Sequence, residues 1–340
     1  MATIRTVQTP DIAGSVELLA ERKVPFALAT VVTVRGSAYR RPGARAVLPV
    51  GGDPIGSLSP GCLEAELVGD ARTVAETGTP ALREFDLTGE DEVELGYGMG
   101  CQGVVEVFLE PPDSAEGLAR VMRQVAEERR TQALVVLIDG PRAGTRLAFT
   151  TNGTTSASTD GIENAVELAR DVIRSGVPAV VTLPNGDRAF VELLRPPIRL
   201  ALFGDRSDAP ALADAARALG WDVSCVSRSE PVPEDLLDDR TFAVVMNHAY
   251  VSDGDRLRAL LDSSVPYVGV LGPRARTERL ISEVSGHPGL GRVFAPAGLD
   301  VGAEGPQEIA SAIVAEIIAV DRGRRGGSLR ERHAPIHGEG

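Results

Sequence analysis

The last third of the chain alternates apolar strand-like runs with amphipathic helical segments, and this pattern constrains the fold more than any other feature. The strand-like runs are RLALFG (199–204), DVSCVSR (222–228), TFAVVMNH (241–248) and YVGVLG (267–272). The helical segments cover 209–220, 256–263, 276–284 and 306–320. Apolar strands that alternate with helices are typical of a parallel sheet covered on both faces. We therefore predict an α/β fold for this part of the chain.

A different pattern precedes the consecutive prolines 196 and 197, which end strand pairing and helix alike and mark the best candidate boundary. A first helix is expected to begin at Thr9-Pro10, with Thr9 as its cap and Pro10 in its first turn. Strands are expected at 26–34, 44–50, 54–59, 81–87, 104–111, 132–139, 145–150, 178–183 and 188–194, and helices at 61–77, 114–130 and 162–175. The prediction is a mixed α/β domain over 1–196, a second domain over 197–323 and a loose tail over 324–340.

Composition excludes several classes of protein. The chain of 340 residues is long enough for two domains, and its net charge of −13 argues against a nucleic-acid or anionic-membrane surface. Its three cysteines are too widely spaced for a disulfide framework or a C-x-x-C metal clip, so we expect a cytoplasmic protein with no metal held by side chains. No stretch resembles a secretory leader or a membrane span.

The segment GDRSDAPALADAARALG (204–220) occupies the place of a dinucleotide fingerprint, between a strand and a helix. Gly204 matches the first glycine and Ala209 the small third position, while Asp205 and the bulky Arg206 stand where close approach of a pyrophosphate is needed. Cofactor binding by Gly204, Asp205 and Arg206 is one interpretation. A tight turn, with Asp208 as the cap of the next helix, is the other.

Other candidate residues follow the remaining strands of this domain. Ser227, Arg228 and Ser229 stand where an NAD site usually carries an acid, so NADP(H) is the dinucleotide that they favour. The alternative for Arg228 is an exposed charge. His248 ends a strand and is the one histidine that we place near a site, in a catalytic or a structural role.

Gly272 and Arg274 lie between the strand at 267–272 and the helix at 276–284, where an arginine beside helix-start amides suits an anion. The final helical segment, 306–320, suits either a core or an interface between protomers, and we expect a homodimer.

The N-terminal half holds a denser group of candidate residues. VRGSAYRRPGARA (34–46) carries Arg35, Arg40, Arg41 and Arg45, and two glycine-rich loops, GSLSPGCLE (56–64) and GYGMGCQG (96–103), carry one cysteine each. Glycine beside cysteine lets a large ligand approach the sulfur, and a helix start stabilises the thiolate. Cys62 and Cys101 are therefore candidates for a ligand cradle. The alternative for each is a buried structural thiol.

Seven ordered motifs, spread from about Ala29 to Val320, resemble the XdhC/CoxI family. They are ATVVTVRGSAYRRPGARAVLPV, GSLSPGCLEAEL, GMGCQGVVEVFLEP, RLALFG, VVMNHAYVSD, YVGVLGPRART and GLDVGAEGPQEIASAIVAEI. The resemblance implies an XdhC/CoxI domain followed by a Rossmann-like domain. It implies a maturation factor for a molybdenum hydroxylase of the xanthine dehydrogenase type, which binds molybdenum cofactor (molybdopterin), helps a cysteine desulfurase to sulfurate it, and delivers it.

The resemblance also implies roles for particular residues: sulfur or cofactor handling for Cys62 and Cys101, and ligand contact for Gly36, Arg40, Gly43, Arg45 and Glu64. Gly61, beside Cys62, is a further candidate for cofactor binding. The chain departs from the family pattern at Ala38-Tyr39-Arg40, at Ser59-Pro60-Gly61, at Arg206 and at Ser227.

Two alternatives follow from these departures. One is an NADP-dependent oxidoreductase, or another nucleotide-dependent biosynthetic enzyme, on the same scaffold. The other is an assembly factor that acts only as a platform for partner proteins.

Overall fold

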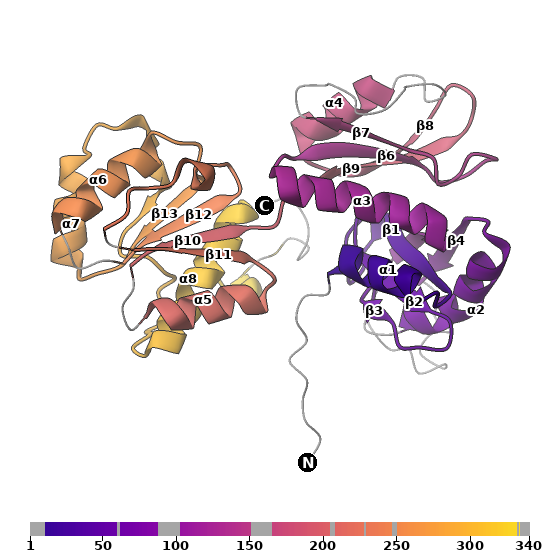
Figure 1. The fold of residues 1–340 in the computed structure, drawn as a ribbon, viewed down its shortest axis with the longest axis horizontal. Coiled ribbons are helices and arrows are strands. Elements are labelled where there is room, and N and C mark those ends of the chain that lie inside the picture. The colour runs from indigo at the N-terminus through magenta and orange to yellow at the C-terminus, as the bar shows by residue number, and fades with distance from the viewer. Residues whose placement is uncertain are drawn as a thin grey trace, which may run out of the picture. The chain divides into compact units, whose positions relative to one another are not determined.

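The computed structural model describes residues 11–59, 62–87, 103–150, 165–204, 208–227, 229–246, 250–331 and 333. The chain divides into two compact units between Pro196 and Pro197 (Figure 1). The N-terminal unit contains two antiparallel sheets and the C-terminal unit one parallel sheet.

The first sheet of the N-terminal unit, sheet A, has the strand order β3-β2-β1-β5-β4. Its strands are β1 (Phe26–Gly36), β2 (Arg45–Pro49), β3 (Ile55–Gly56), β4 (Ala81–Asp86) and β5 (Gly103–Glu110). Neighbouring strands are all antiparallel, with Thr30 opposite Arg45 and Gly36 opposite Gly103. The apolar runs that predict these strands supply both buried faces of the sheet.

The second sheet, sheet B, has the order β7-β6-β9-β8. Its strands are β6 (Gln132–Leu137), β7 (Arg146–Thr150), β8 (Ala179–Thr182) and β9 (Arg188–Leu194). The helices of this unit are α1 (Ile12–Glu21), α2 (Cys62–Thr77), α3 (Pro112–Glu128) and α4 (Ala165–Ser175).

The strands of both sheets alternate their side chains between two layers of core. Ala27, Ala29 and Val31 of β1 pack with Leu63 and Leu67 of α2 on the outer face of sheet A. Phe26 and Leu28 point the other way, into a core shared with α1, α3 and sheet B. The outer face of sheet B packs against α4, through a cluster that includes Ala169 and Val172. Successive side chains of a strand point to opposite faces of its sheet, so a strand buried on both faces contributes alternate residues to each core.

Three arginine–glutamate pairs join the facing sides of the two sheets, one partner from each sheet. The pairs are Arg45–Glu192, Arg146–Glu110 and Arg188–Glu106. Each glutamate side chain is at most 8% exposed. Burying such charges costs free energy unless each has a partner, so the three pairs favour this relative register of the two sheets.

Arg146 shows how tightly this layer is built. Its guanidinium bonds the Glu110 carboxylate, the Ser114 carbonyl and, at 3.0 Å, the Ser114 hydroxyl. A Cβ at Gly117 of α3 would lie 2.9 Å from an Arg146 Nη, so glycine makes room for this guanidinium. Burial lowers the pKa of Arg146, and Glu110 opposes that shift.

A small cavity of about 10 Å³ lies in the same layer, close to the size that one water molecule needs. Its lining includes Thr30, Arg45, Glu110, Arg146 and Glu192.

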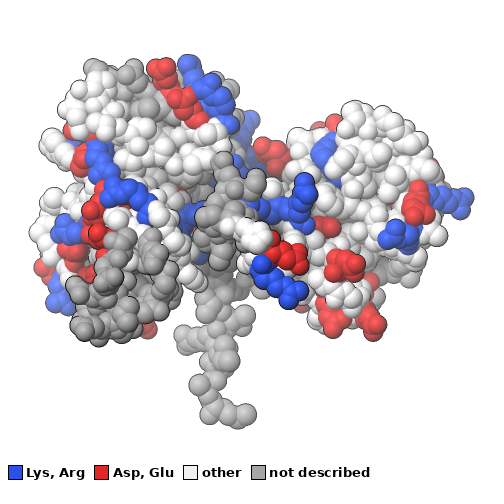
Figure 2. All heavy atoms as spheres, turned by 180° about the vertical axis from the view of Figure 1, so that it is seen from behind, with Lys and Arg blue, Asp and Glu red and all other residues white. Residues whose placement is uncertain are grey.

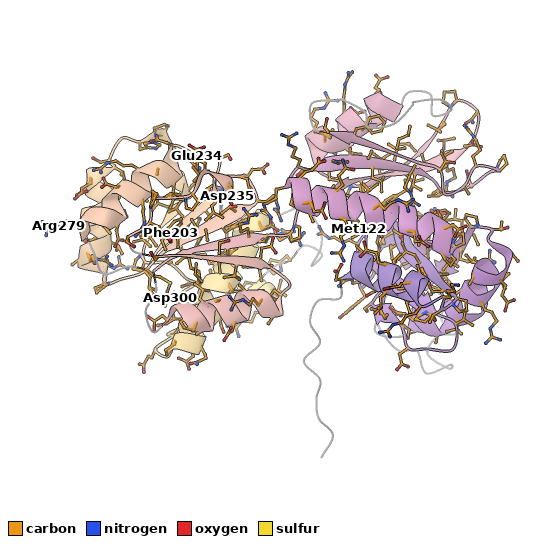
Figure 3. The ribbon with its side chains drawn as sticks, viewed as in Figure 1. Met122, Phe203, Glu234, Asp235, Arg279 and Asp300 are labelled. Carbon is orange, nitrogen blue, oxygen red and sulfur yellow. The ribbon has the colours of Figure 1, made fainter. Side chains whose placement is uncertain are left out.

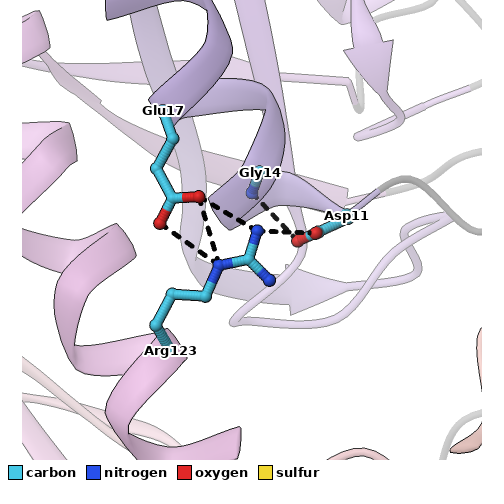
Figure 4. Close-up of polar contacts among 4 residues, drawn as sticks. All are labelled: Asp11, Gly14, Glu17 and Arg123. Carbon is cyan, nitrogen blue, oxygen red and sulfur yellow. Dashed lines mark hydrogen bonds and ion pairs between the residues drawn. The ribbon is translucent and has the colours of Figure 1, made fainter.

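Helices α1 and α3 are tied by an exposed guanidinium. Arg123 of α3 donates to Asp11 at 2.9 Å and to Glu17 at 3.0 Å (Figure 4). Asp11 also accepts from the Gly14 amide at 3.0 Å, which makes it the N-cap of α1. The predicted cap at Thr9 with Pro10 in the first turn is therefore wrong, because an aspartate side chain nearer the helix satisfies the free amide.

The C-terminal unit is built on sheet C, a parallel sheet with the order β11-β10-β12-β13-β14. Its strands are β10 (Arg199–Phe203), β11 (Asp222–Val226), β12 (Thr241–Val245), β13 (Tyr267–Val270) and β14 (Val293–Phe294). The helices are α5 (Ala209–Ala218), α6 (Tyr250–Leu261), α7 (Arg274–Glu283) and α8 (Pro306–Asp321).

Helices cover both faces of sheet C, which confirms the prediction. Residues of α5 and α8, among them Leu212 and Ile313, pack on one face, and residues of α6 and α7, among them Leu257 and Leu280, pack on the other. Phe203 of β10 lies inside the unit, whereas Arg279 of α7 points outward (Figure 3).

Tyr267 and Glu316 fix helix α8 to the sheet. The Tyr267 hydroxyl donates to the Glu316 carboxylate at 2.6 Å, and the Gly298 amide donates to the same oxygen at 2.9 Å. Burial and the neighbouring carboxylate raise the pKa of Tyr267, so the hydroxyl stays a donor.

Several element bounds differ from the prediction. Helix α6 begins at Tyr250, six residues before the predicted start, and β3 covers only Ile55–Gly56. The short strand β14 was absent from the prediction because two residues carry too little periodicity to be recognised.

Candidate functional site

Three loops leave sheet A at the same end. Because β1 is antiparallel to β2 and β5, the end of β1 at Gly36 lies beside Gly103, the start of β5. The start of β2 lies on the same side, since Arg45 pairs with Thr30, and so does the end of β3, since Gly56 pairs with Ala46. The end of β4 lies there too, since Asp86 pairs with Val104. The strand ends that bound the segments 37–44 and 87–102, and the strand end that precedes the segment 57–61, therefore all lie at this end of the sheet.

The first of these segments, the arginine loop (37–44), is fixed at its base. Its residue Ala44 accepts a hydrogen bond from the Val31 amide at 2.9 Å, and the Gly43 amide donates to the Val31 carbonyl at 2.8 Å. Gly43 has a φ of 93°, and a Cβ there would lie 3.2 Å from a Glu192 carboxylate oxygen. Only glycine therefore suits this position.

Arg45 belongs to the base of the loop. Its guanidinium bonds Glu192 of sheet B and donates to the Gly43 carbonyl at 3.1 Å, and its side chain is 9% exposed. This side chain faces the layer between the sheets, where it holds the arginine loop against sheet B.

The other end of the loop starts at Gly36, which has a φ of 83°. Across the sheet, a Cβ on Gly103 would lie 2.6 Å from the Ser37 carbonyl oxygen, so the two strands approach closely here. Arg35 is exposed and pairs with Glu84 at 2.7 Å.

The tip of the loop faces solvent. Tyr39 is 54% exposed and Arg40 is also exposed. Within the part of the chain that the structure describes, Arg40 makes no ion pair. Of the predicted residues Gly36, Arg40, Gly43 and Arg45, Arg40 is thus the one that offers a cation to a ligand in solution.

The segment after β3 is held by a single carboxylate. Glu64, in the first turn of α2, accepts from the Leu58 amide at 2.6 Å, from the Ser59 amide at 3.0 Å and from the Ser59 hydroxyl. Burial works to raise the pKa of Glu64, but the Ser59 hydroxyl and the backbone amides outweigh it, and the net shift is downward. Glu64 is therefore an ionised, buried acceptor.

Cys62 is the first residue of α2, as the glycine-rich approach to a helix predicts. Its side chain, and all of Gly61 and Cys101, lie outside the described residues. Their sulfur-handling and ligand roles stay predictions. The segment that contains Cys101 joins Leu87 to Gly103, and the Leu87 amide bonds the Gly103 carbonyl at 2.9 Å.

In the C-terminal unit, the predicted glycines stand at the carboxyl ends of parallel strands. Gly204 follows β10 with a φ of 147°, and Gly272 lies between β13 and α7 with a φ of 151°. Arg274, the first residue of α7, is exposed. Asp205, Arg206, Arg228 and His248 lie outside the described residues, and their predicted roles are untested.

Ser227 and Ser229 follow β11, where a 2′-phosphate was expected, and both already have partners. Their hydroxyls lie 3.1 Å apart, and the Ser227 amide donates to the Glu230 carboxylate at 3.0 Å. An acidic side chain thus stands at the end of this strand.

Sequence reasoning missed a buried charged group at this end of sheet C. Arg256 of α6 donates to the carbonyls of Ser227 and Glu230 at 2.8 and 2.9 Å, and its guanidinium lies 5.7 Å from the centre of the Phe203 ring. Nearby, Arg276 of α7 pairs with Asp253 of α6. Arg276 is in the first turn of α7, where the sequence places arginines beside a helix start, whereas Arg256 is in the second turn of α6 and carried no such signal.

The described residues contain no group of three His, Cys, Asp or Glu side chains placed to hold a metal ion. Among the same residues, no helix has the length and apolar character needed to cross a membrane. On the face shown in Figure 2, arginine and acidic side chains are interspersed over the N-terminal unit, so no single-sign surface is visible there.

Family models match parts of both units. The family model described as "XdhC and CoxI family" matches residues 19–86, and the one described as "XdhC Rossmann domain" matches residues 200–317. The matched regions contain the arginine loop, the start of α2 and nearly all of sheet C.

Three similar proteins illustrate the relationship. A Bacillus subtilis protein named as a probable xanthine dehydrogenase subunit is 31% identical over 326 residues, which cover 89% of this chain and 95% of that protein. The Escherichia coli "Molybdenum cofactor insertion chaperone PaoD" is 25% identical over 297 residues, covering 86% and 82%. A solved structure described as a xanthine dehydrogenase from Bacillus halodurans has a TM-score of 0.73 and 25% identity, over 94% and 98% of the two chains.

These matches extend over both units and agree with the parallel sheet C and the mixed α/β architecture. The chain therefore belongs to the XdhC and CoxI family.

Proposed function

We propose that the protein is a maturation factor that binds molybdenum cofactor as its cargo, supports sulfuration of the cofactor and delivers it to a molybdenum hydroxylase of the xanthine dehydrogenase type. The observation that carries this proposal is that the strand ends next to the arginine loop, the Cys62 segment and the Cys101 segment lie at one end of sheet A. We include in the proposal a cytoplasmic location, a homodimeric state and a cysteine desulfurase as the sulfur source.

The arginine loop suits a pterin that carries a phosphate. Arg40 is an exposed cation on a loop fixed at both ends, which suits a phosphate group. Thiols are the side chains that soft sulfur and molybdenum chemistry favours, and Cys62 and Cys101 each stand within six residues of a strand end on this side of the sheet. Arg45 acts in this proposal by holding the loop, because its guanidinium is bonded to Glu192.

The names of two relatives support the same role. One is a cofactor insertion chaperone and the other a probable component of xanthine dehydrogenase. Both align with most of this chain, so the support concerns the whole protein and not one unit alone.

Cofactor binding is tested by purifying the protein anaerobically after incubation with molybdenum cofactor released from a molybdenum hydroxylase. We expect molybdenum and pterin fluorescence to stay with the wild-type protein. Arg40→Ala should weaken retention about tenfold, which corresponds to ~1.4 kcal/mol. Arg170→Ala, an exposed arginine on α4, is the matched control. Retention of neither molybdenum nor pterin by the wild type would refute the proposal.

The alternative of an NADP-dependent oxidoreductase is less well supported. The Glu230 carboxylate occupies the Ser227 amide and brings negative charge to the place where a 2′-phosphate would bind. Titration with NADPH and NADH distinguishes the oxidoreductase from the maturation factor. Tight binding of NADPH that Arg228→Ala weakens would favour the oxidoreductase. Absence of binding at millimolar nucleotide would exclude the oxidoreductase.

The assembly-platform alternative makes a separate prediction. If the protein only holds partners together, Cys62→Ser and Cys101→Ser should leave activation of the hydroxylase unchanged. If the thiols handle sulfur, these variants should yield hydroxylase that contains molybdenum but lacks the sulfido ligand, as assayed by cyanolysis.

A further inference from the structure

Glu64 has an unusual environment for a residue expected to contact a ligand. Glu64 is only 5% exposed, and its carboxylate is directed at backbone amides of the preceding turn. One oxygen accepts from two consecutive amides, those of Leu58 and Ser59, and the other accepts from the Ser59 hydroxyl. A carboxylate that already accepts three hydrogen bonds in the interior has little capacity left for a ligand.

Ser59 completes a closed set of hydrogen bonds with Glu64. The Ser59 hydroxyl donates to Glu64 and accepts from the Leu63 amide at 3.1 Å, so it caps the first turn of α2. The Ser57 hydroxyl donates to the Ser59 carbonyl at 2.6 Å. These bonds span both sides of residues 60–61 and fix the position at which the chain enters the helix.

The same segment is anchored in the core. Leu58 and Leu63, on either side of the turn, are 2% and 3% exposed and pack in the cluster formed by β1, β5 and α2. A ligand could reach the Glu64 carboxylate only by breaking these contacts.

We propose that Glu64 is a positioning residue: acting through Ser59 and Leu58, it fixes the start of α2, and with it the backbone of Cys62, at the end of sheet A where the arginine loop lies. This inference deepens the proposed function, and it assigns Glu64 a role that differs from direct contact with the cofactor. The ionised carboxylate is the group required, since it accepts from two amides and a hydroxyl at once.

The chain offers a matched set of variants. Glu64→Gln removes the charge and one strong acceptor, Ser59→Ala removes the hydroxyl, and the double variant removes both. Glu64→Asp keeps the charge on a shorter side chain, so it should fail to restore the bonds. Glu66→Gln is the control, because Glu66 is exposed, belongs to the same helix and undergoes the same change of charge.

The first measurement is amide hydrogen exchange on the full chain without any ligand. Glu64→Gln should speed exchange of the Leu58 and Ser59 amides at least tenfold, while Glu66→Gln leaves it within twofold. Exchange in strand β1 should be unchanged in both variants, which shows that the unit is folded. Unchanged exchange at Leu58 and Ser59 in Glu64→Gln would overturn the inference.

The second measurement is retention of molybdenum cofactor by the same variants. If Glu64 acts through Ser59, Glu64→Gln and Ser59→Ala should each weaken binding about tenfold and the double variant no further, because the two losses are coupled; Glu66→Gln should bind as the wild type does. Losses that multiply to about a hundredfold would indicate direct contact by Glu64 and contradict positioning. Failure of the wild type to bind cofactor would refute the proposed function, while the exchange measurement would still decide the role of Glu64.

Discussion

Neighbouring charged residues of this protein differ in role according to the direction of a single side chain. Arg40 and Arg45 belong to one motif, yet Arg40 faces solvent and Arg45 is paired inside with Glu192. Glu64 and Glu66 differ in the same way on one helix. Charge alone therefore does not identify the residues that meet a ligand.

The pH dependence of stability follows from Glu106. Its bond with Arg188 lowers the pKa of this carboxyl, against the effect of burial. A lowered pKa gives stability that is present above the unfolded value, about 4.3, and is lost as the pH falls through the folded value. Glu106→Gln should therefore destabilise the protein at pH 7, and its difference from wild type should shrink below about pH 4.

Urea denaturation at pH 7, 5 and 3.5 measures this effect. Glu84→Gln serves as the control, because Glu84 and its partner Arg35 are more than half exposed and such pairs contribute little. If the difference in free energy of unfolding between wild type and Glu106→Gln stays constant across this pH range, the lowered pKa of Glu106 does not contribute to stability.

A second prediction at this scale concerns Tyr267. Tyr267→Phe removes the hydroxyl that donates to Glu316, and we expect a loss of about 1–2 kcal/mol in the free energy of unfolding. Tyr39→Phe removes a hydroxyl from an exposed ring and should change stability by less than about 0.5 kcal/mol. If Tyr267→Phe and Tyr39→Phe lower the free energy of unfolding equally in a urea titration, the Tyr267–Glu316 hydrogen bond does not contribute to stability.

At the scale of elements, the layer between sheets A and B combines apolar contacts with arginine–glutamate pairs. Val32 and Phe108 of sheet A pack against Val136 and Phe190 of sheet B. Glu106 and Glu110 flank Phe108 on β5, and Arg188 and Glu192 flank Phe190 on β9, so one alternation of side chains places both kinds of contact. The arginine loop inherits its position from this layer through Arg45.

A double substitution tests whether the pair between Arg45 and Glu192 is needed as a pair. Glu192→Leu alone leaves a buried guanidinium without its partner and should cost about 3–5 kcal/mol. Combining it with Arg45→Met removes both charges and should recover most of that loss, to within about 1–2 kcal/mol of wild type. Free energies of unfolding are measured by denaturant titration. A double variant whose loss equals the sum of the losses of the two single variants would show that the two residues are not needed as a pair.

The sequence predicted most helices and strands because their periodicities are local. The run FALATVVTV corresponds to β1, RAFVELL to β9 and PQEIASAIVAEIIAV to α8. The parallel sheet C followed from the alternation of strands with helices, a regularity that needs no long-range contact to be seen.

The site was less predictable, because its organisation depends on pairing across the fold. Glu106, Glu110 and Glu192 are charged residues inside apolar strands, and their partners lie far away in sequence. Arg45 falls in the predicted strand at 44–50 and Arg40 does not, but no local pattern reveals that Arg45 pairs with Glu192. The role of Glu64 likewise depends on a turn that precedes it and on burial that a helical pattern does not reveal.

For the whole molecule, the important feature is that each unit has its own core. Clusters around Leu200 and Phe203 belong to the C-terminal unit, and those around Ala27 and Phe26 belong to the N-terminal unit. Two domains with separate cores unfold as separate cooperative units when their stabilities differ.

Scanning calorimetry should therefore resolve two transitions. Ile313→Ala removes a side chain that is 0% exposed in α8 and should lower one transition, at a cost of about 2–5 kcal/mol, while leaving the other in place. Ile318→Ala, on the 41% exposed side of the same helix, should shift neither by more than a degree or two. A single transition that moves as a whole in Ile313→Ala would show one cooperative unit instead.

The bond between Arg45 and Glu192 joins positions 147 residues apart. Neither residue can change alone without leaving a charge stranded in the interior, whereas Arg40 can change without that cost. Among descendants of a common ancestor, positions 45 and 192 should therefore mutate together, and position 40 should vary with the molecule that is bound. A record of paired substitutions would thus separate the arginine that maintains the fold from the one that selects the ligand.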